Sequence, residues 1–591
     1  MSALVDQAEA ALRAGRAAEA CSLLERALAG GLDTRTQTEA RSMFGLALLT
    51  TGAVEQALPH LQAAVTAEPG EAMFRYNLAC GLERAGQMDA AVAEHREAVR
   101  LSGGMAPLKL ALGNALVLAG HYAEAIAVLQ PFVAGPNAAK AVIRNFAQCL
   151  HATGDMHGAI DQAQRIQPPD IAAADAQGRA DALLLARLYQ GAMYYPEATA
   201  IGEALVARDR GDGEAAALLA PLALWTDGPD AARVIIERAL ETNAGSPELM
   251  VQLLGYNDAV DDALLARIGS IAGSDAMPAP VRGELLLALA QYHDRAGDPD
   301  RAWELATQGN ALVPTAEPRD WRGTLETHLQ LYRDVPPVEV SVDATPHFYL
   351  CGAPRSGQSL VQSILAAAPQ VASAGERGAL LPHLLWRTAE IAGMVATQKA
   401  ALYTELEQAD RRGLTRLLGA DAGLIVDKNP SNLAVAGSIA RVHPHARFGA
   451  SLRDPADVAL SIYLRGFSSA YDYAADFGQI LDHLDYMLDA IAAWEGEGLE
   501  ILLLDHAALV ADPAGQGARL FDWLGIAWNE SYLAPENRTQ PVPTFSAAQV
   551  RKPVGKGGSR GAAPYARHIE PFAAQIDALR AKQVRLLEQT G

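Results

Sequence analysis

A glycine that recurs at a constant interval is the feature that most constrains how this chain can fold. The interval is 34 residues each time, at Gly52, Gly86, Gly120 and Gly154. An alanine follows five residues after each glycine, at Ala57, Ala91, Ala125 and Ala159. Glycine tolerates the left-handed backbone of a tight turn, and alanine lets two helices approach closely. Because a fixed period of this length is typical of repeat architectures, the pattern predicts a stack of helical hairpins.

A 34-residue helix–turn–helix with this glycine and alanine pattern resembles the tetratricopeptide repeat. The likeness is strongest over residues 7–165. The same pair recurs once earlier and once later, at Gly15 with Ala20 and at Gly297 with Ala302. We expect seven or eight hairpins in a first domain over residues 1–335; the alternative is a generic alanine-rich helical bundle. The resemblance implies a solenoid whose concave groove would hold a peptide or protein partner.

Charge is distributed unevenly along the chain and limits its partners. The 591 residues include 48 Lys and Arg against 69 Asp and Glu, a net charge of −21, which argues against a nucleic-acid partner. Residues 1–340 hold 26 basic and 43 acidic residues, whereas residues 341–591 hold 22 and 26. Most of the negative charge therefore belongs to the repeat half. There it either favours basic peptide segments or only improves solubility.

The cysteines and the N-terminal sequence indicate a reducing compartment. Four widely separated cysteines are expected to be reduced thiols, at Cys21, Cys80, Cys149 and Cys351. The N-terminal residues lack a basic, apolar leader, and no uninterrupted apolar run reaches the roughly 18–20 residues of a membrane span. We therefore expect a cytoplasmic protein without a membrane partner. The histidines show no metal-ligand spacing, so no metal site is predicted.

The second half changes character near three prolines, Pro336, Pro337 and Pro346. An apolar strand over 347–351 is followed by a glycine-rich turn and a helix to residue 368. Further strands are predicted over 424–427, 446–452 and 499–504, and helices over 379–393, 432–441, 456–464, 478–494 and 514–524. This alternation favours an α/β domain with a mainly parallel sheet. The predicted fold is an all-α repeat solenoid followed by a P-loop-like α/β domain over residues 336–591.

The turn after the first strand has the spacing of a phosphate-binding loop. Gly352 and Gly357 follow the G-x-x-x-x-G pattern, and Ser359 stands at the usual hydroxyl position. Gln358, however, replaces the lysine that metal-dependent phosphoryl transfer requires, and the positive charge lies within the loop at Arg355. A phosphoryl-transfer enzyme is therefore disfavoured. A purely structural turn stays open on this motif alone.

Four more motifs follow the loop in a fixed order. They are Gly375-Glu376, Asp427-Lys-Asn-Pro430, Arg453 with Ser461, and the segment from Ser546 through Lys552 to Val554. Together with the loop, this set resembles the sulfotransferases that use 3′-phosphoadenosine 5′-phosphosulfate (PAPS). In particular, it resembles a bacterial branch that joins tetratricopeptide repeats to a domain similar to tyrosylprotein sulfotransferases. The resemblance covers residues 345–575.

The resemblance implies a role for each motif. Glu376 would be the general base, Lys428 would neutralise the leaving group, and Arg355 would stabilise the transferred group. The PAPS-binding residues would be Gly352, Pro354, Arg355, Ser356, Gly357, Gln358, Ser359, Arg453, Ser461, Ser546 and Lys552. Arg453 and Ser461 would hold the 3′-phosphate, although Arg453 has a structural alternative in an ion pair with Asp454 or Asp457.

The predicted reaction is a metal-free, in-line transfer of a sulfuryl group from PAPS to a hydroxyl. Protein tyrosine is the favoured acceptor; a glycan, a small molecule and a catalytically weak scaffold that binds the nucleotide are alternatives. Departures from the family pattern bear on the rate, since Gln358 replaces a threonine and Arg377 would pair with Glu376. The segment 465–473 is either part of an acceptor rim or a connector.

Overall fold

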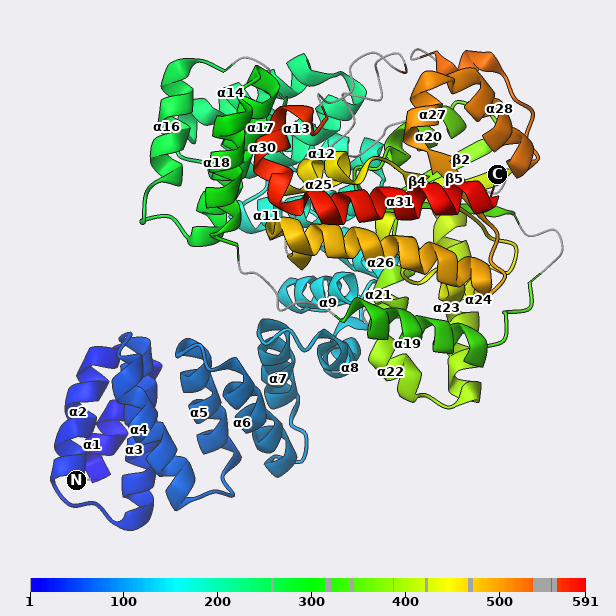
Figure 1. Cartoon of the computed structure of the whole chain (residues 1–591). Coiled ribbons are helices and arrows are strands. Elements are labelled where there is room, and N and C mark those ends of the chain that lie inside the picture. Colours follow the sequence, from blue (N-terminus) through cyan, green and yellow to red (C-terminus); the bar gives the residue numbers. More distant parts are fainter. Residues whose placement is uncertain are drawn as a thin grey trace. The chain divides into compact units, whose positions relative to one another are not determined.

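The computed structural model describes residues 2–256, 260–313, 320–340, 345–385, 387–419, 423–465, 471–534, 554 and 561–590. Its contacts divide the chain into two compact units, Met1–Pro168 and Pro169–Gly591. Figure 1 shows helices throughout the chain and strands in the second unit alone.

The described part of the first unit, residues 2–168, consists of ten helices paired as five hairpins. These helices are α1 (Ser2–Arg13), α2 (Ala17–Ala29), α3 (Thr34–Thr50), α4 (Val54–Ala67), α5 (Ala72–Arg84), α6 (Met88–Leu101), α7 (Ala106–Leu118), α8 (Tyr122–Val133), α9 (Lys140–Ala152) and α10 (Met156–Ile166). The helices α4, α6, α8 and α10 begin 34 residues apart. The predicted period is thereby confirmed.

The glycine and alanine positions serve the predicted purposes. The four periodic glycines have φ between +75° and +90°. The four alanines are fully buried where each second helix packs on the first. Farther along the chain the repeat weakens, because the left-handed position after α11 (Ala176–Gly191) falls on Met193, with φ of +64°, instead of on a glycine.

The second unit begins with further helices that continue the hairpin pattern. They are α11, α12 (Tyr195–Arg208), α13 (Gly213–Thr226), α14 (Pro229–Thr242), α15 (Pro247–Tyr256), α16 (Asp262–Ala272), α17 (Ala279–Ala296), α18 (Pro299–Asn310) and α19 (Trp321–Asp334). Consecutive helices pack in pairs at α11 with α12, α13 with α14 and α17 with α18. None of the helices in the described ranges has both the length and the apolar character needed to cross a membrane.

A parallel five-stranded sheet follows, which confirms the predicted α/β architecture. Its strands are β1 (His347–Cys351), β2 (Val371–Gly375), β3 (Leu424–Lys428), β4 (Arg447–Leu452) and β5 (Ile501–Asp505). Their order across the sheet is β2-β3-β1-β4-β5. In register, Leu350 of β1 lies opposite Lys428 on one side and Gly449 on the other.

Helices cover both faces of this sheet. Phe348 and Leu350 pack against α20 (Gln358–Leu365), α27 (His506–Ala511) and α28 (Pro513–Leu524). Tyr349 lies in the other core, with α24 (Ala436–Val442), α25 (Pro455–Tyr463), α26 (Phe477–Gly496) and α31 (Ala573–Thr590). Neighbouring residues of one strand thus face opposite layers, as the pleat requires.

The remaining elements are short, with one exception. They are α21 (Leu381–Leu384), α22 (Thr388–Gly393), α23 (Ala396–Leu418), α30 (Ala566–Ile569), and the 3₁₀ turns η1 (Pro430–Leu433), η2 (Asp472–Ala475), η3 (Glu530–Leu533), η5 (Ala563–Tyr565) and η6 (Glu570–Phe572). The predicted helix over 379–393 is two shorter helices, α21 and α22. The 23-residue α23 was not predicted, because its buried stripe includes the polar residues Lys399 and Asp410, which obscure the apolar period.

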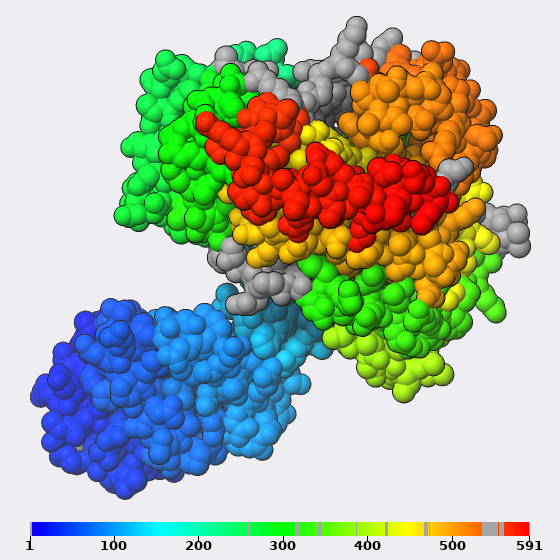
Figure 2. Space-filling model, in the orientation of Figure 1, coloured from blue at the N-terminus to red at the C-terminus, as the bar shows by residue number. Residues whose placement is uncertain are grey.

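The helices α13–α19 share one hydrophobic core with a face of the sheet. Asn310 of α18 donates to the Tyr463 carbonyl at 3.0 Å, and the Trp303 ring packs 4.9 Å from the Tyr463 ring. The C-terminal helix α31 packs on α25 and α26, and it forms the long red band on the face seen in Figure 2. A functional boundary at residues 335 and 336 stays a prediction.

Candidate active site

The predicted site residues meet at the carboxyl edge of the parallel sheet. The loop 352–357 directly follows β1, and Glu376 directly follows β2. Lys428 is the last residue of β3, and Arg453 comes after β4. In open α/β sheets, ligands bind at this edge, because the loops after adjacent strands converge there. The strand order therefore brings together four motifs that lie up to 100 residues apart.

The loop holds a tight backbone that admits little beyond glycine at two positions. Gly352 has φ of +122°, and a Cβ there would lie 2.8 Å from the Ser451 carbonyl oxygen. Gly357 has φ of +106°, and a Cβ there would collide with Cδ2 of His506. Arg355 also has a positive φ, +70°, which is rare for a non-glycine residue. Such backbone strain clusters at ligand-binding sites.

Replacing Gly357 by alanine should destabilise the protein. The left-handed backbone alone costs about 1–3 kcal/mol for an ordinary residue, and the methyl group also meets His506. We expect a lower thermal unfolding midpoint in scanning calorimetry. Gly393→Ala is the matched control, since a Cβ at this helical position has nothing within 4 Å. Equal midpoints for the two variants would contradict the steric account of the loop.

Arg355 lies at the centre of a buried cationic group. Its Nε donates to Ser461 Oγ at 3.0 Å, and its carbonyl accepts from Arg453 Nη1 at 3.4 Å. Burial, together with the charges of Arg465 and Arg453, holds the pKa of Arg355 well below its ordinary value. Like charges that crowd a buried site favour a bound anion, because the anion offsets their repulsion. The loop is thus suited to a strongly anionic ligand.

The other loop residues divide between internal bonds and free donors. Pro354 and Ser356 are buried, and the Ser356 hydroxyl donates to the Ala353 carbonyl at 2.7 Å. Gln358 is also buried, and its Nε2 has no hydrogen-bond partner within the described part of the chain. Buried amides normally find partners, so this donor is suited to a ligand oxygen. Ser359 Oγ accepts from Lys428 Nζ at 3.4 Å.

Glu376 and Lys428 form an ion pair at the ends of β2 and β3. The Lys428 side chain is 2% exposed, whereas that of Glu376 is 41% exposed. Burial lowers the pKa of Lys428, and the charge of Glu376 opposes this shift. The pair therefore combines a carboxylate that solvent-borne molecules can reach with an ammonium group directed toward the loop.

The predicted pairing of Arg377 with Glu376 is wrong. Arg377 Nη1 instead binds Asp410 of α23, whose other carboxylate oxygen contacts His443 Nε2 at 3.0 Å. The charge of Arg377 and the bond to His443 hold the pKa of Asp410 below its usual range against the effect of burial. Asp410 draws Arg377 away, and this leaves Glu376 to Lys428.

Asp427, which precedes Lys428, is a second buried carboxyl group. Burial raises its pKa to about 7, although Asn432 Nδ2 donates to its Oδ1 at 2.8 Å. Because the folded pKa exceeds the unfolded value of about 3.9, the protonated form stabilises the fold at low pH. This contribution is lost as the pH rises through about 7.

The Asp427→Asn variant tests this assignment. The unfolding free energy of the wild type relative to the variant should fall by about 4 kcal/mol between pH 4 and pH 8. Urea unfolding at a series of pH values measures it. Asp505→Asn, at the partly exposed end of β5, is the control. A difference between wild type and Asp427→Asn that is independent of pH would contradict the raised pKa.

Arg453 makes the ion pair that was its structural alternative, with Asp457 Oδ2 at 3.0 Å. Its carbonyl also accepts from Gln583 Nε2 of α31 at 3.0 Å, and Arg580 binds the adjacent Asp454 at 2.7 Å. The C-terminal helix thus fixes the backbone beside the loop. This contribution was missed from sequence, because nothing in the spacing of α31 points to residues some 130 positions earlier.

Comparison with known proteins assigns this part of the chain. Residues 346–530 match the model of the sulfotransferase family. This segment is a sulfotransferase-family domain. Together with the preceding hairpins, which resemble tetratricopeptide repeats, it confirms the combination of repeats and sulfotransferase domain indicated by the sequence.

Two relatives share part of the chain. An uncharacterized protein of Aquifex aeolicus (strain VF5) is 25% identical over 352 residues, which cover 55% of this chain and 46% of that protein. Protein-tyrosine sulfotransferase 1 of Danio rerio is 26% identical over 219 residues, or 35% of this chain and 61% of that protein. The chain therefore spans about half of the first relative and 61% of the second.

Solved structures include similar parts. The sulfotransferase domain from the Synechococcus PCC 7002 olefin synthase is 17% identical, with a TM-score of 0.26, and the match covers 40% of this chain and 98% of that one. A tetratricopeptide repeat protein from Parabacteroides merdae ATCC 43184 is 13% identical, with a TM-score of 0.32, covering 43% of this chain and 96% of that one.

Two tyrosines approach Glu376 of the sulfotransferase domain from different segments. Burial and then the charge of Glu376 raise the pKa of Tyr195, which lies on α12 and packs edge-on against Trp225 at 5.2 Å. Burial and the same charge raise the pKa of Tyr471, against a hydrogen bond from Ser431. Tyr195 was missed from sequence, since it lies in the repeat half, whereas Tyr471 belongs to the predicted acceptor rim.

Ser546 and Lys552, the remaining predicted PAPS ligands, lie outside the described residues. So do residues 466–470 of the predicted acceptor rim. Of the other predicted site residues, the structure brings Glu376, Lys428 and Ser359 into direct contact, and it joins Arg355 to Ser461 and Arg453.

Proposed function

We propose that this chain transfers a sulfuryl group from PAPS to an acceptor hydroxyl, with protein tyrosine as the favoured acceptor. The observation that carries the proposal is the ion pair between exposed Glu376 and buried Lys428 beside the cationic loop. A base and a leaving-group cation must lie on either side of the reacting group in an in-line displacement. The two side chains are suited to these separate roles by their exposure.

The loop residues fit the nucleotide that the family uses. Backbone N–H groups of 352–359, the start of α20 and the unpartnered Gln358 Nε2 offer donors to phosphate and sulfate oxygens. Gly352, Pro354, Ser356 and Gly357 shape this cradle. Arg453 and Ser461 would bind the 3′-phosphate, and Ser546 and Lys552 would add contacts. When bound, PAPS supplies the activated sulfuryl group.

The chain's own groups would then act as follows. Glu376 accepts the proton of the acceptor hydroxyl, since its carboxylate is exposed on the solvent side. Lys428 and Arg355 offset negative charge at the loop, where burial strengthens their electrostatic effect. Arginine and lysine supply this compensation, so the transfer is proposed to need no metal ion.

An aromatic acceptor is supported by the surroundings of Glu376. Tyr195 and Tyr471 lie near its carboxylate, and Trp225 packs beside Tyr195. Aromatic walls suit a phenol, because offset and edge-on ring contacts add to apolar burial. The relative from Danio rerio bears the name of a protein-tyrosine sulfotransferase. We further propose that the repeats hold the peptide substrate and that the protein acts in the cytoplasm.

The test is transfer of label from ³⁵S-labelled PAPS to tyrosine peptides, glycans and small phenols, with a chelator present. We expect labelled tyrosine peptide from wild type and none from Glu376→Ala, while the variant still binds the nucleotide. Equal labelling by both proteins would refute the assigned base. If wild type binds the nucleotide but labels no acceptor, the weak scaffold replaces the enzyme. Magnesium-dependent ATP hydrolysis would favour phosphoryl transfer instead.

A further inference from the structure

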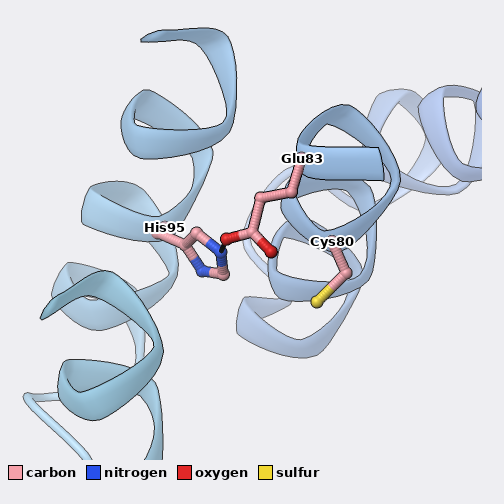
Figure 3. Close-up of side chains that lie close together, drawn as sticks. All are labelled: Cys80, Glu83 and His95. Atoms are coloured by element: carbon pink, nitrogen blue, oxygen red, sulfur yellow. Dashed lines mark hydrogen bonds and ion pairs between the residues drawn. The ribbon is translucent and has the colours of Figure 1, made fainter. Parts of the chain in front are cut away.

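A polar side-chain cluster lies between α5 and α6, within the first unit and apart from the sulfotransferase domain. Cys80 and Glu83 are one helical turn apart on α5, and His95 is on α6. A sulfur, a carboxylate oxygen and an imidazole nitrogen of these residues lie within 4.8 Å of one another. In Figure 3 the Glu83 carboxylate lies between the His95 ring and the Cys80 thiol.

The cluster replaces apolar core of the repeat. At the position of His95, the preceding and following repeats carry Leu61 and Leu129, both fully buried. At the position of Glu83 they carry Leu49 and Val117. A leucine would satisfy the packing of this position, as it does in both neighbours. The packing of the hairpins therefore does not explain a histidine and a carboxylate here.

The polar groups also carry an energetic cost. His95 is 1% exposed, and its Nδ1 has no hydrogen-bond partner within the described part of the chain. Its Nε2 contacts Glu83 Oε1 at 2.9 Å. Burying an unpartnered polar atom is unfavourable, and a bound ligand that uses the cluster would offset this cost.

The surroundings of Cys80 suit a thiolate ligand. Burial raises the pKa of the Cys80 thiol, and the Tyr76 hydroxyl is hydrogen-bonded to it. The negative charge of Cys80, with burial, raises the pKa of Tyr76 to about 12, so this hydroxyl keeps its proton and donates to the sulfur. Donors of this kind orient and tune metal ligands.

A second group of potential ligands in the chain lacks this character. His347, Asp410 and His443 also lie within 4.8 Å of one another. Asp410, however, is already neutralised by the Arg377 guanidinium, whose positive charge would repel a cation. In the α5–α6 cluster, Glu83 pairs instead with a histidine, which can bind a metal through its neutral form.

We propose that Cys80, Glu83 and His95 bind a divalent cation of the zinc class. Sulfur, nitrogen and oxygen ligands are those that Zn²⁺ takes, and three protein ligands leave a fourth position for water or a partner's side chain. Binding displaces the thiol proton of Cys80 to solvent and replaces the contact between His95 and Glu83 with two metal bonds. This revises the sequence-based prediction of no metal site, because two helices supply the ligands.

Titration of the chelator-treated full-length protein with Co²⁺, followed by Zn²⁺, tests the site. We expect one Co²⁺ per chain with a thiolate-to-cobalt charge-transfer band, which Zn²⁺ then removes. Cys80→Ser should lose the band, and His95→Leu should weaken Zn²⁺ binding about a hundredfold or more in calorimetry. Cys21→Ser, at a partly exposed cysteine of α2, is the matched control and should bind as wild type does.

His95→Leu keeps the test decisive, because it introduces the residue that both neighbouring repeats carry. Circular dichroism should show an unfolding midpoint without metal at or above that of the wild type. Absence of Co²⁺ and Zn²⁺ binding in the wild type would overturn the site. Retention of the band by Cys80→Ser, or wild-type affinity in His95→Leu, would overturn it equally. None of these readouts depends on sulfuryl transfer.

Discussion

Replacing Lys428 by methionine should lower kcat for sulfuryl transfer by about 10³-fold while leaving the protein folded. Methionine fills the buried volume of the lysine stem but removes the ammonium group that pairs with Glu376 and contacts Ser359. In the proposed mechanism this group offsets the charge of the departing phosphate. The effect should therefore appear in kcat in the labelled-PAPS assay, with a smaller change in nucleotide affinity.

Lys399 offers a matched control for this experiment. It is buried on α23 and pairs with the partly exposed Asp334 at 3.3 Å, so it shares the burial and ion pairing of Lys428 outside the site. Lys399→Met should affect stability without a specific loss of transfer. If both variants lose activity in proportion to their stability, Lys428 has a structural role only.

The second large effect is expected at Arg355. Arg355→Asn removes the buried charge, and asparagine tolerates the positive φ of this position better than alanine does. Two charge-assisted hydrogen bonds lost at about 1.5 kcal/mol each correspond to about a hundredfold weaker nucleotide binding. Calorimetry with 3′-phosphoadenosine 5′-phosphate measures this change directly.

The salt dependence of binding separates charge from shape at Arg355. Wild-type affinity should fall with added salt, and Arg355→Asn should flatten this slope. Arg412→Asn, at an exposed arginine of α23, is the control and should keep both affinity and slope. Unchanged affinity in Arg355→Asn would show that the cationic group does not hold the nucleotide.

The sequence predicted features that are local in the chain. The 34-residue period located the second helix of each hairpin, and the strand ends located Glu376, Lys428 and Arg453. These predictions succeeded because apolar strands and glycine turns are encoded over a few residues. The parallel sheet then followed from the alternation of strands and helices.

Contacts between distant segments were not predictable in this way. Asp410 takes Arg377 from Glu376 across 33 residues, and Tyr195 approaches Glu376 from 181 residues away. Neither contact has a spacing that a single sequence reveals. The α5–α6 cluster is intermediate, since comparison of Leu61, His95 and Leu129 at the 34-residue period exposes the odd residue.

Calorimetric titration of the full-length protein with 3′-phosphoadenosine 5′-phosphate, in the presence of a chelator, tests the central claim most directly. The account predicts one nucleotide bound per chain without magnesium, and weaker binding in Arg355→Asn. Absence of binding, or binding of ATP that requires magnesium and exceeds that of this nucleotide, would contradict the proposed sulfotransferase.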